Sequence, residues 1–447
     1  LYTSLTSAAG FLSLMLTPIP PVRVFGAFVA LGIGLAFVLT ILFVPAYITA
    51  LPEKRLAALL SSKRDPEEGG LLGRVVEAVG ARSLRYAKPI LVLTVAVIAI
   101  SGYGISQINI NDNPVRWFKP SHKIRVADDV LNRELAGTYM AFLVMKQDTD
   151  AEKEIVAAGD AALEGTDDGF QATWDTLKTE ARTESEAGDT TVVDALIEKT
   201  SDLSFDTTGD QSALWQSVQT ALEEAQTQTK TFQNPEHLAY IERLQQEAEA
   251  LPLVGKTSSI ADVVKTVYRE LISGEDADFR IPDTTEGVAQ TLLQFQSSHR
   301  PNDLWHLVSP DYRESAVWVQ LKSGDNQDMM AVKTDLDAYL AANPPPEGLR
   351  AEWAGLTYLN VVWQEEMVGG MLESLMGAFV IVFLMMMILF RSPVYGALAM
   401  VPLTITIVFT YGIIGLVGKD YDMPVAVLSS LTLGLSVDFA IHFLERA

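Results

Sequence analysis

The chain of 447 residues contains no cysteine and only five histidines. Without cysteine it can form no disulfide bond and no thiol-based site, and the redox state of its compartment is left open. The histidines show no metal-ligand spacing, and no G-x-S-x-G nucleophile motif occurs. The sequence therefore predicts no bound metal, no cofactor and no enzymatic reaction.

Basic residues are also scarce, with 33 Lys and Arg against 56 Asp and Glu. The excess acid lies in residues 106–366, which hold 46 acidic and 21 basic side chains, whereas the remainder holds 10 and 12. Nucleic-acid binding relies on Lys and Arg at phosphates, so this composition argues against a nucleic-acid partner. It is typical of a soluble domain that net charge keeps in solution.

A phosphate-binding loop is absent as well. The stretch LVGKTSS (253–259) resembles the end of the G-x-x-x-x-G-K-[ST] motif, but Ala250 stands where the first glycine is required. We therefore expect no nucleotide to bind at this stretch.

Long apolar runs are abundant in this chain. A membrane-spanning helix needs about 20 mostly apolar residues. Six stretches meet or nearly meet this requirement: residues 1–17, 24–50, 89–107, 371–390, 394–416 and 424–444. The first run starts without a Met, a basic segment or a cleavage site, so we expect a fragment of a longer protein and no signal peptide.

Basic residues in short loops indicate the orientation of the spans. The linker 53–88 carries eight Lys and Arg and is therefore expected to be cytoplasmic. Arg391 and Arg446 fall on the same side by alternation. The acidic block 108–366 then faces outward.

This outer block has the pattern of a mixed α and β domain. The stretches 137–146 and 314–322 are rich in β-branched, aromatic and aliphatic residues and predict strands, and 349–357 is a weaker strand candidate. A helical pattern over 326–343 links the last two, which resembles half of a split β-α-β unit. Residues 148–230 are acidic and poor in large aliphatics, so we expect a helical, mobile insertion with loose packing.

The last predicted span contains an acid. Asp438 lies mid-span, and on a helix it shares a face with Gly434 and His442. Gly434 and Ser436 are small residues of the kind that allow close helix packing. A carboxylate at this depth costs about 2.5–3.5 kcal/mol, so proton transfer is the favoured interpretation, with His442 a weaker second group. The alternative is that Asp438 is a structural hydrogen-bonding anchor between helices.

Several stretches together resemble the resistance–nodulation–division (RND) superfamily of exporters, in its MMPL-type branch of lipid exporters. The last of them is GLSVDFAIHFLER (434–446). The others are AAGFLSLMLTPIPPVRVFGAFVALGIG (8–34), NDNPVRWFKPSH (111–122), LFRSPVYGALAMVPLT (389–404), WAGLTYLNVVWQEEMVGGMLESL (353–375) and VGKDYDMPVAVLSSLTLGLSVDFAIHF (417–443).

The resemblance implies a fold and a domain order. Family members have twelve spans in two repeats of six, with a large periplasmic domain after the first and the seventh span. The six spans here resemble the fifth to the tenth. The implied parts are spans at 1–52, a cytoplasmic linker at 53–88, a span at 89–107, a porter-like α+β periplasmic domain at 108–366, and spans at 367–447.

The resemblance also implies a mechanism. The tenth span of the family carries an Asp-Tyr pair of a proton relay, which Asp438 matches, while Phe439 stands in place of the Tyr. The implied activity is export of a lipid, such as a hopanoid, or of another hydrophobic substrate from the inner membrane, driven by protons. Membrane lipids, further copies in a dimer or trimer, and a periplasmic adaptor are the implied partners. A sterol-sensing-like receptor without transport and a protein-export accessory are the alternatives.

Overall fold

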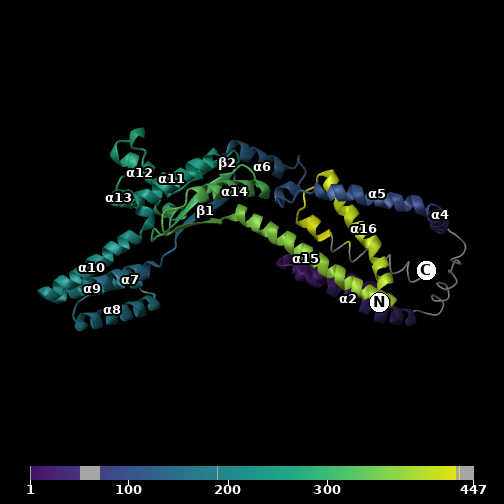
Figure 1. Cartoon of the computed structure of the whole chain (residues 1–447), viewed down its shortest axis with the longest axis horizontal. Coiled ribbons are helices and arrows are strands. Elements are labelled where there is room, and N and C mark those ends of the chain that lie inside the picture. Colours follow the sequence, from purple (N-terminus) through teal and green to yellow (C-terminus); the bar gives the residue numbers. More distant parts are fainter. Residues whose placement is uncertain (1, 51–70, 189, 429–431, 433–447) are drawn as a thin grey trace. The chain divides into compact units, whose positions relative to one another are not determined.

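The computed structural model describes residues 2–50, 71–188, 190–428 and 432 (Figure 1). The chain divides into two compact units. The first, here called the helical unit, comprises residues 1–117 and 360–447, and the second, called the α+β unit, comprises residues 118–359.

Among the residues that the structure describes, four helices are long and apolar enough to cross a membrane. They are α2 (Pro20–Thr49), α5 (Ala87–Ser106), α15 (Leu356–Phe390) and α16 (Pro393–Val417). They coincide with the predicted spans at 24–50, 89–107, 371–390 and 394–416. Most of their large apolar side chains are exposed on the isolated chain, as expected of surfaces that face lipid.

Helix α15 begins at Leu356, 15 residues before the predicted span 371–390. The 35 residues of α15 correspond to about 52 Å at 1.5 Å per residue, against a hydrocarbon core of about 30 Å. Its apolar part, 371–390, alone is long enough to cross. The preceding residues of the same helix therefore extend beyond the hydrocarbon.

The first predicted span is shorter in the structure than expected. Residues 1–17 contain α1 (Tyr2–Leu12), followed by a 3₁₀ turn, η1 (Ser13–Leu16). The turn is fixed to α15 by a 2.8 Å hydrogen bond from the Ser374 hydroxyl to the Ser13 carbonyl. The last predicted span, 424–444, lies mainly outside the described residues.

The α+β unit contains a four-stranded sheet in the order β2-β3-β1-β4. The strands are β1 (Tyr139–Gln147), β2 (Val254–Ser258), β3 (Glu314–Leu321) and β4 (Leu349–Ala354). In β1 and β3 every second residue is buried, as alternating sequences require when one face of a sheet packs against helices. The three predicted strands and the predicted helix, which is α14 (Asn326–Ala342), are thereby confirmed.

The connection from β3 through α14 to β4 has the predicted order of strand, helix and strand, and with β1 between the two strands it forms a split β-α-β unit. Both β3 and β4 pair with β1 in antiparallel fashion, so they run parallel to each other with β1 between them. Leu143 and Met145 of β1, Val317 of β3 and Leu336 of α14 are all almost fully buried. Figure 1 shows α14 and α11 (Pro235–Ala250) beside the sheet.

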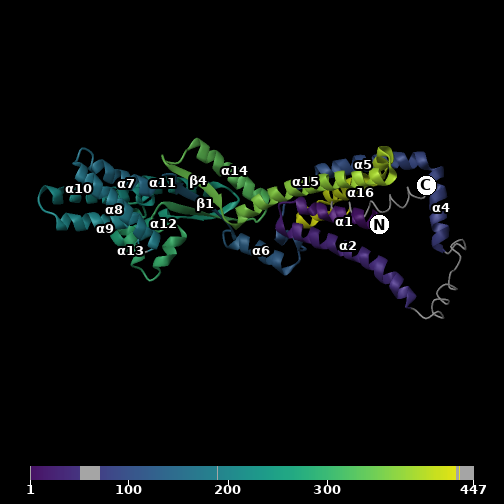
Figure 2. The same ribbon diagram turned by 90° about the horizontal axis from the view of Figure 1, so that it is seen from below.

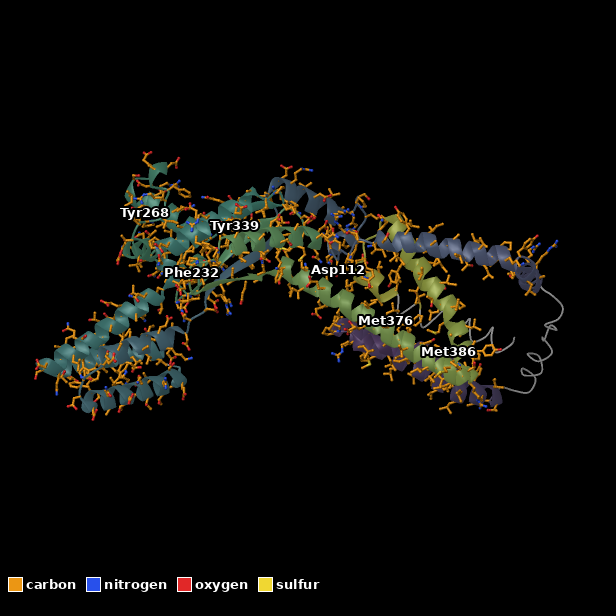
Figure 3. All side chains as sticks on the ribbon, viewed as in Figure 1. Asp112, Phe232, Tyr268, Tyr339, Met376 and Met386 are labelled. Carbon is orange, nitrogen blue, oxygen red and sulfur yellow. The ribbon has the colours of Figure 1, made fainter. Side chains whose placement is uncertain are left out.

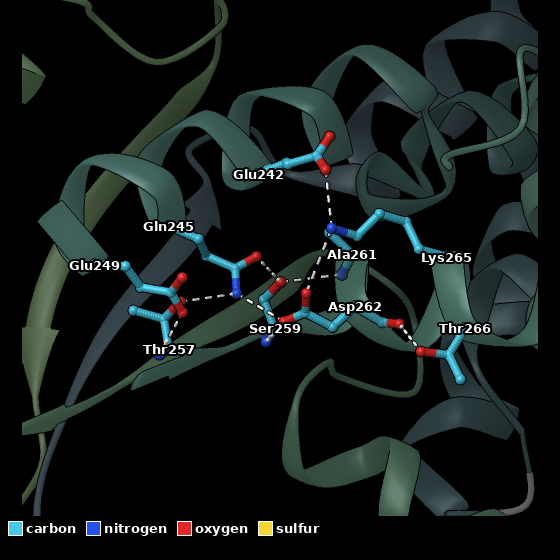
Figure 4. A network of polar contacts seen from close by, with 9 residues as sticks. All are labelled: Glu242, Gln245, Glu249, Thr257, Ser259, Ala261, Asp262, Lys265 and Thr266. Atoms are coloured by element: carbon cyan, nitrogen blue, oxygen red, sulfur yellow. Dashed lines mark hydrogen bonds and ion pairs between the residues drawn. The ribbon is translucent and has the colours of Figure 1, made fainter. Parts of the chain in front are cut away.

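The sequence did not predict strand β2, which lies within LVGKTSS. Figure 4 shows the polar contacts that hold this stretch. Ser259 and Asp262 form a capping box at the start of α12 (Ile260–Ile272). Gln245 of α11 accepts from the Ser259 hydroxyl at 2.7 Å and donates to Asp262 at 2.7 Å. The Gly-Lys-Thr-Ser residues therefore form an edge strand and a helix cap.

The expectation of loose packing in 148–230 is wrong. The segment forms α7 (Ala151–Ala162), α8 (Asp168–Ala187), α9 (Val192–Asp206) and α10 (Asp210–Thr229), which lie side by side in Figures 1 and 2. They enclose their own core, with Trp174 and Trp215 2% and 3% exposed. A Cβ atom on Gly159 would lie 2.5 Å from the Trp174 ring. Small residues thus let two tryptophans fill the space that larger aliphatics usually fill.

Further helices complete the described chain. In the helical unit, α4 (Leu71–Arg85) precedes α5, and η2 (Pro114–Trp117) follows it. In the α+β unit they are α6 (Lys123–Glu134), η3 (Thr231–Gln233), η4 (Asp276–Asp278), α13 (Thr285–Gln296) and η5 (Pro301–His306).

Candidate functional site

The predicted proton site lies outside the described residues. Its members are Gly434, Ser436, Asp438, Phe439 and His442. The helix that is predicted to carry them can be followed over residues 423–428. The structure therefore describes the surroundings of the start of this helix, and these surroundings contain a cavity and a polar cluster.

Helices α5 and α16 approach each other through small residues. A Cβ atom on Gly104 would lie 2.2 Å from the carbonyl oxygen of Gly412, and one on Gly415 would lie 1.8 Å from that of Gly104. Ser101 contacts Gly412 in the same way. Because small residues allow membrane helices to pack backbone to backbone, these positions bring α5 and α16 together near their C-terminal ends.

A mainly apolar cavity of about 350 Å³ opens beside this contact. Its walls come from the end of α5 and the residues after it, from α15, and from two tyrosines. They include Ile105, Ile110, Met371, Leu372, Tyr411 and Tyr421. A cavity with mostly aliphatic walls and few polar groups is suited to the hydrocarbon part of an amphipathic molecule.

The two tyrosines supply the polar groups of the cavity. Their rings lie 6.0 Å apart, and the Tyr411 hydroxyl donates to the Val425 carbonyl at 3.4 Å. Burial raises the pKa of the Tyr421 phenol, and the neighbouring Tyr411 acts in the same direction. Tyr421 is therefore a neutral hydrogen-bonding group beside apolar walls.

Next to the cavity, residues 109–113 pair with residues 419–423, and we call these two segments together the clasp. Ile110 and Tyr421 form a parallel β-bridge. The Tyr421 N–H donates to the Asn109 carbonyl at 2.7 Å, and the Asn111 N–H donates to the Tyr421 carbonyl at 3.3 Å. The clasp joins the segment after α5 to the start of the helix at 423.

Side chains strengthen the clasp. Asp420 accepts hydrogen bonds from the side-chain amides of Asn109, at 3.2 Å, and Asn111, at 3.5 Å. Asp112 accepts from the Met423 N–H at 3.2 Å and thereby caps the helix that begins at Met423. The N–H of Asp112 donates to the Gln364 side chain at 2.9 Å. The clasp is thus also attached to α15.

Three carboxylates and one ammonium group lie in the clasp. Asp422 is 2% exposed, accepts from the Val425 N–H at 3.1 Å and forms an ion pair with Lys419. Asp112, labelled in Figure 3, is 8% exposed. Burial raises the pKa of its carboxyl group, and the charge of Asp422 adds to this, whereas the hydrogen bonds from the Met423 N–H and the Trp117 side chain and the charge of Lys419 act in the opposite direction.

The sequence did not point to the clasp as a site. Its two segments are about 310 positions apart, and no local periodicity links them. The available signal was the clustering of acids and amides in NINDN (109–113) and KDYD (419–422). Within the part of the chain that the structure describes, no group of His, Asp and Glu could hold a metal ion.

Comparison with known proteins shows the family of the chain. The sequence model of the MMPL family matches residues 140–447, which is more than half of the chain. The chain belongs to the MMPL family. The matched range of this MMPL protein includes Asp438 and the 419–423 segment of the clasp, and its apolar helices identify it as a multi-pass membrane protein.

Two further proteins are similar to this MMPL chain. MJ1562 of Methanocaldococcus jannaschii, whose name describes it as a membrane protein, is 24% identical over 167 residues, which cover 37% of this chain and 42% of MJ1562. The cryo-EM structure of the hedgehog release protein Disp from the water bear Hypsibius dujardini aligns with 99% of this chain and 48% of its own, with a TM-score of 0.47 and 15% identity. This chain therefore spans less than half the length of either protein.

Proposed function

We propose that the chain is part of a proton-driven exporter of a lipid or other amphipathic substrate. The observation that carries this proposal is the apolar cavity among α5, α15 and α16, with two phenols on its wall. Membership of the MMPL family supports a transport role for such a cavity. No enzymatic step is needed, because the substrate moves without a change of its covalent structure.

The position of the cavity along α15 indicates which part of a lipid it holds. Its α15 residues, from Val368 to Leu375, lie where the apolar part of that helix begins. This level is the boundary between the hydrocarbon and the polar headgroups. A substrate with its chain among the isoleucines and its polar end near Tyr411 and Tyr421 would enter from the membrane.

Asp438 is the group that would bind the driving proton. Moving one charge across the membrane is worth about 2.3 kcal/mol per 100 mV, which is enough to bias a two-state helix arrangement more than tenfold. His442 is a second candidate in the same proton path. Phe439 in place of a Tyr removes one hydroxyl from the relay on this helix, so the proton path on this helix would depend on the acid.

The proposal includes a location and partners. The acidic α+β unit would lie in the periplasm as a porter-like domain, and the protein would be in the inner membrane with α4 on the cytoplasmic side. Membrane lipids supply the substrate. Assembly as a dimer or trimer, and contact with a periplasmic adaptor, follow from the resemblance to RND exporters.

A cavity-filling substitution tests the proposal. Leu372→Trp places a larger side chain in the cavity, and Leu384→Trp makes the same change on an exposed position of the same helix that does not line it. We expect Leu372→Trp to lower export at least several-fold and Leu384→Trp to leave it unchanged at equal expression. The measurement is mass spectrometry of inner- and outer-membrane lipids in cells with the full-length gene.

Two outcomes would contradict the exporter proposal. If both variants and the wild type have the same lipid distribution as a strain without the gene, no lipid is moved. If a lipid binds to the purified protein but is not redistributed in cells, a sterol-sensing-like receptor becomes the better interpretation.

A further inference from the structure

The clasp contains two buried carboxylates at one helix start. Asp112 accepts from the Met423 N–H and Asp422 accepts from the Val425 N–H, two residues further along the same helix. The side chains are 8% and 2% exposed. Burial disfavours the charged form of Asp112, and the charge of Asp422 acts in the same direction, so Asp112 retains a proton more readily than free aspartate.

The neighbouring groups leave Asp112 as the acid that takes the proton. Lys419 neutralises Asp422 through their ion pair, and Asp420 is held by the amides of Asn109 and Asn111. From α15, the uncharged Gln364 contacts the backbone of Asp112. Burial has the largest effect on the pKa of Asp112, upward, and the charge of Asp422 also raises it, whereas the charge of Lys419 and the hydrogen bonds from the Met423 N–H and the Trp117 side chain lower it.

The clasp also connects two parts of the proposed mechanism. On one side it holds the first turn of the helix that is predicted to carry Asp438. On the other side, residues 109–113 lead through η2 directly into the α+β unit, which begins at Phe118. Any displacement of the helix start must therefore either pull on this segment or open the clasp.

We propose that Asp112 is a proton-binding latch: with a proton on Asp112 the clasp is closed, and loss of that proton loosens the hold of residues 109–113 on the start of the helix at 423. Asp112 is a positioning residue, because it acts on the helix and does not contact a substrate. The use of the latch in export rests on the proposed function, whereas its opening and closing does not.

The direction of the pH effect follows from the raised pKa of the Asp112 carboxyl group. The pKa of Asp112 is raised in the closed clasp, so closing takes up a proton. The latch is fully stabilised below the ordinary aspartate pKa of about 3.9, and this stabilisation is lost as the pH rises through the raised value. The acidic side of the membrane would keep the clasp closed.

Hydrogen exchange of the full chain in lipid nanodiscs tests the latch. The amides of Asn111, Tyr421 and Met423 donate within the clasp, so peptides that contain them report on its opening. After correction for intrinsic exchange, we expect wild-type protection of these peptides to fall as the pH is raised from 4 towards 8, by at most tenfold per pH unit for one linked proton. Peptides from α2 serve as the internal reference.

Three variants separate the latch from a simple cap. Asp112→Asn keeps an acceptor for Met423 without a charge, so its clasp should stay protected at all pH values. Asp112→Leu removes the acceptor and should lower protection at all pH values. Asp420→Asn removes a charge from the same clasp and should retain the pH dependence of the wild type.

The proposal is overturned if wild-type protection does not depend on pH, if Asp112→Asn retains the wild-type pH dependence, or if Asp420→Asn loses it. Equal loss of protection in Asp112→Asn and Asp112→Leu would also overturn it, because the side chain would then act through its charge alone. None of these results depends on whether the protein exports a lipid, so failure of the latch and failure of the exporter proposal are distinguishable.

Discussion

At the scale of single residues, glycines decide where the membrane helices meet. Gly102 and Gly104 lie two positions apart on α5. A Cβ atom on Gly104 would collide with α16, whereas one on Gly102 would meet nothing within 4 Å. The sequence showed both glycines but not which one faces a partner. That distinction depends on a contact with Gly412, which no local pattern predicts.

This pair provides a matched test of the packing. Gly104→Ala should destabilise the helical unit by about 1–3 kcal/mol, because the added methyl group overlaps the Gly412 carbonyl. Gly102→Ala should change stability by less than about 0.5 kcal/mol. Thermal unfolding in detergent measures both, and equal stability of the two variants would show that α5 and α16 do not meet as described.

At the scale of elements, the strands were the most predictable part of the fold. The alternating apolar residues of 139–147 and 314–321 identify their own buried face, so sequence and structure agree closely there. Strand β2 was missed because VGKTS is short and polar, and only its pairing with β3 makes it a strand. The start of α15 was missed because polar residues precede the apolar run of the same helix.

A helical insertion over 148–230 was expected, but its close packing was not. The composition of this segment is rich in alanine and poor in large aliphatic residues, which predicts loose packing. The packing depends instead on the positions of Trp174 and Trp215 in its core. The ring of Trp174 also donates to Asp160 at 2.6 Å, which fixes α8 to α7. A core built from a few large residues among many small ones cannot be recognised from average hydrophobicity.

A truncation tests whether this helical segment is well packed. Trp174→Ala should cost about 3–5 kcal/mol, because it removes a buried ring from the core that α7 to α10 share. Phe205→Ala, which removes an 84% exposed ring from the same segment, is the control and should be nearly neutral. Limited proteolysis reports on both, and equal cleavage of the two variants within 148–230 would contradict a packed core.

At the scale of the whole molecule, topology and transport are the remaining questions. The basic linker and the acidic block predict opposite sides of the membrane, by the excess of Lys and Arg in cytoplasmic loops. Apolar length predicted four helices of the described chain well. The proton site rests on the sequence and on the MMPL match, since Asp438 lies outside the described residues.

The absence of cysteine makes the topology straightforward to test. Ser298→Cys in the α+β unit should react with a membrane-impermeant maleimide in intact spheroplasts, and Ser83→Cys in α4 should react only after permeabilisation. Both serines are exposed, and both changes are close to isosteric. Labelling of Ser83→Cys in intact spheroplasts would place α4 on the outside and invert the proposed orientation.

The most direct measurement of the central proposal compares wild type with Asp438→Asn, at matched expression of the full-length gene, by mass spectrometry of inner- and outer-membrane lipids. The substitution removes the proton-binding group with almost no change of volume. We predict that one lipid class falls in the outer membrane and accumulates in the inner membrane. Identical lipid profiles with a correctly folded variant would contradict proton-driven lipid export and leave Asp438 with a structural role.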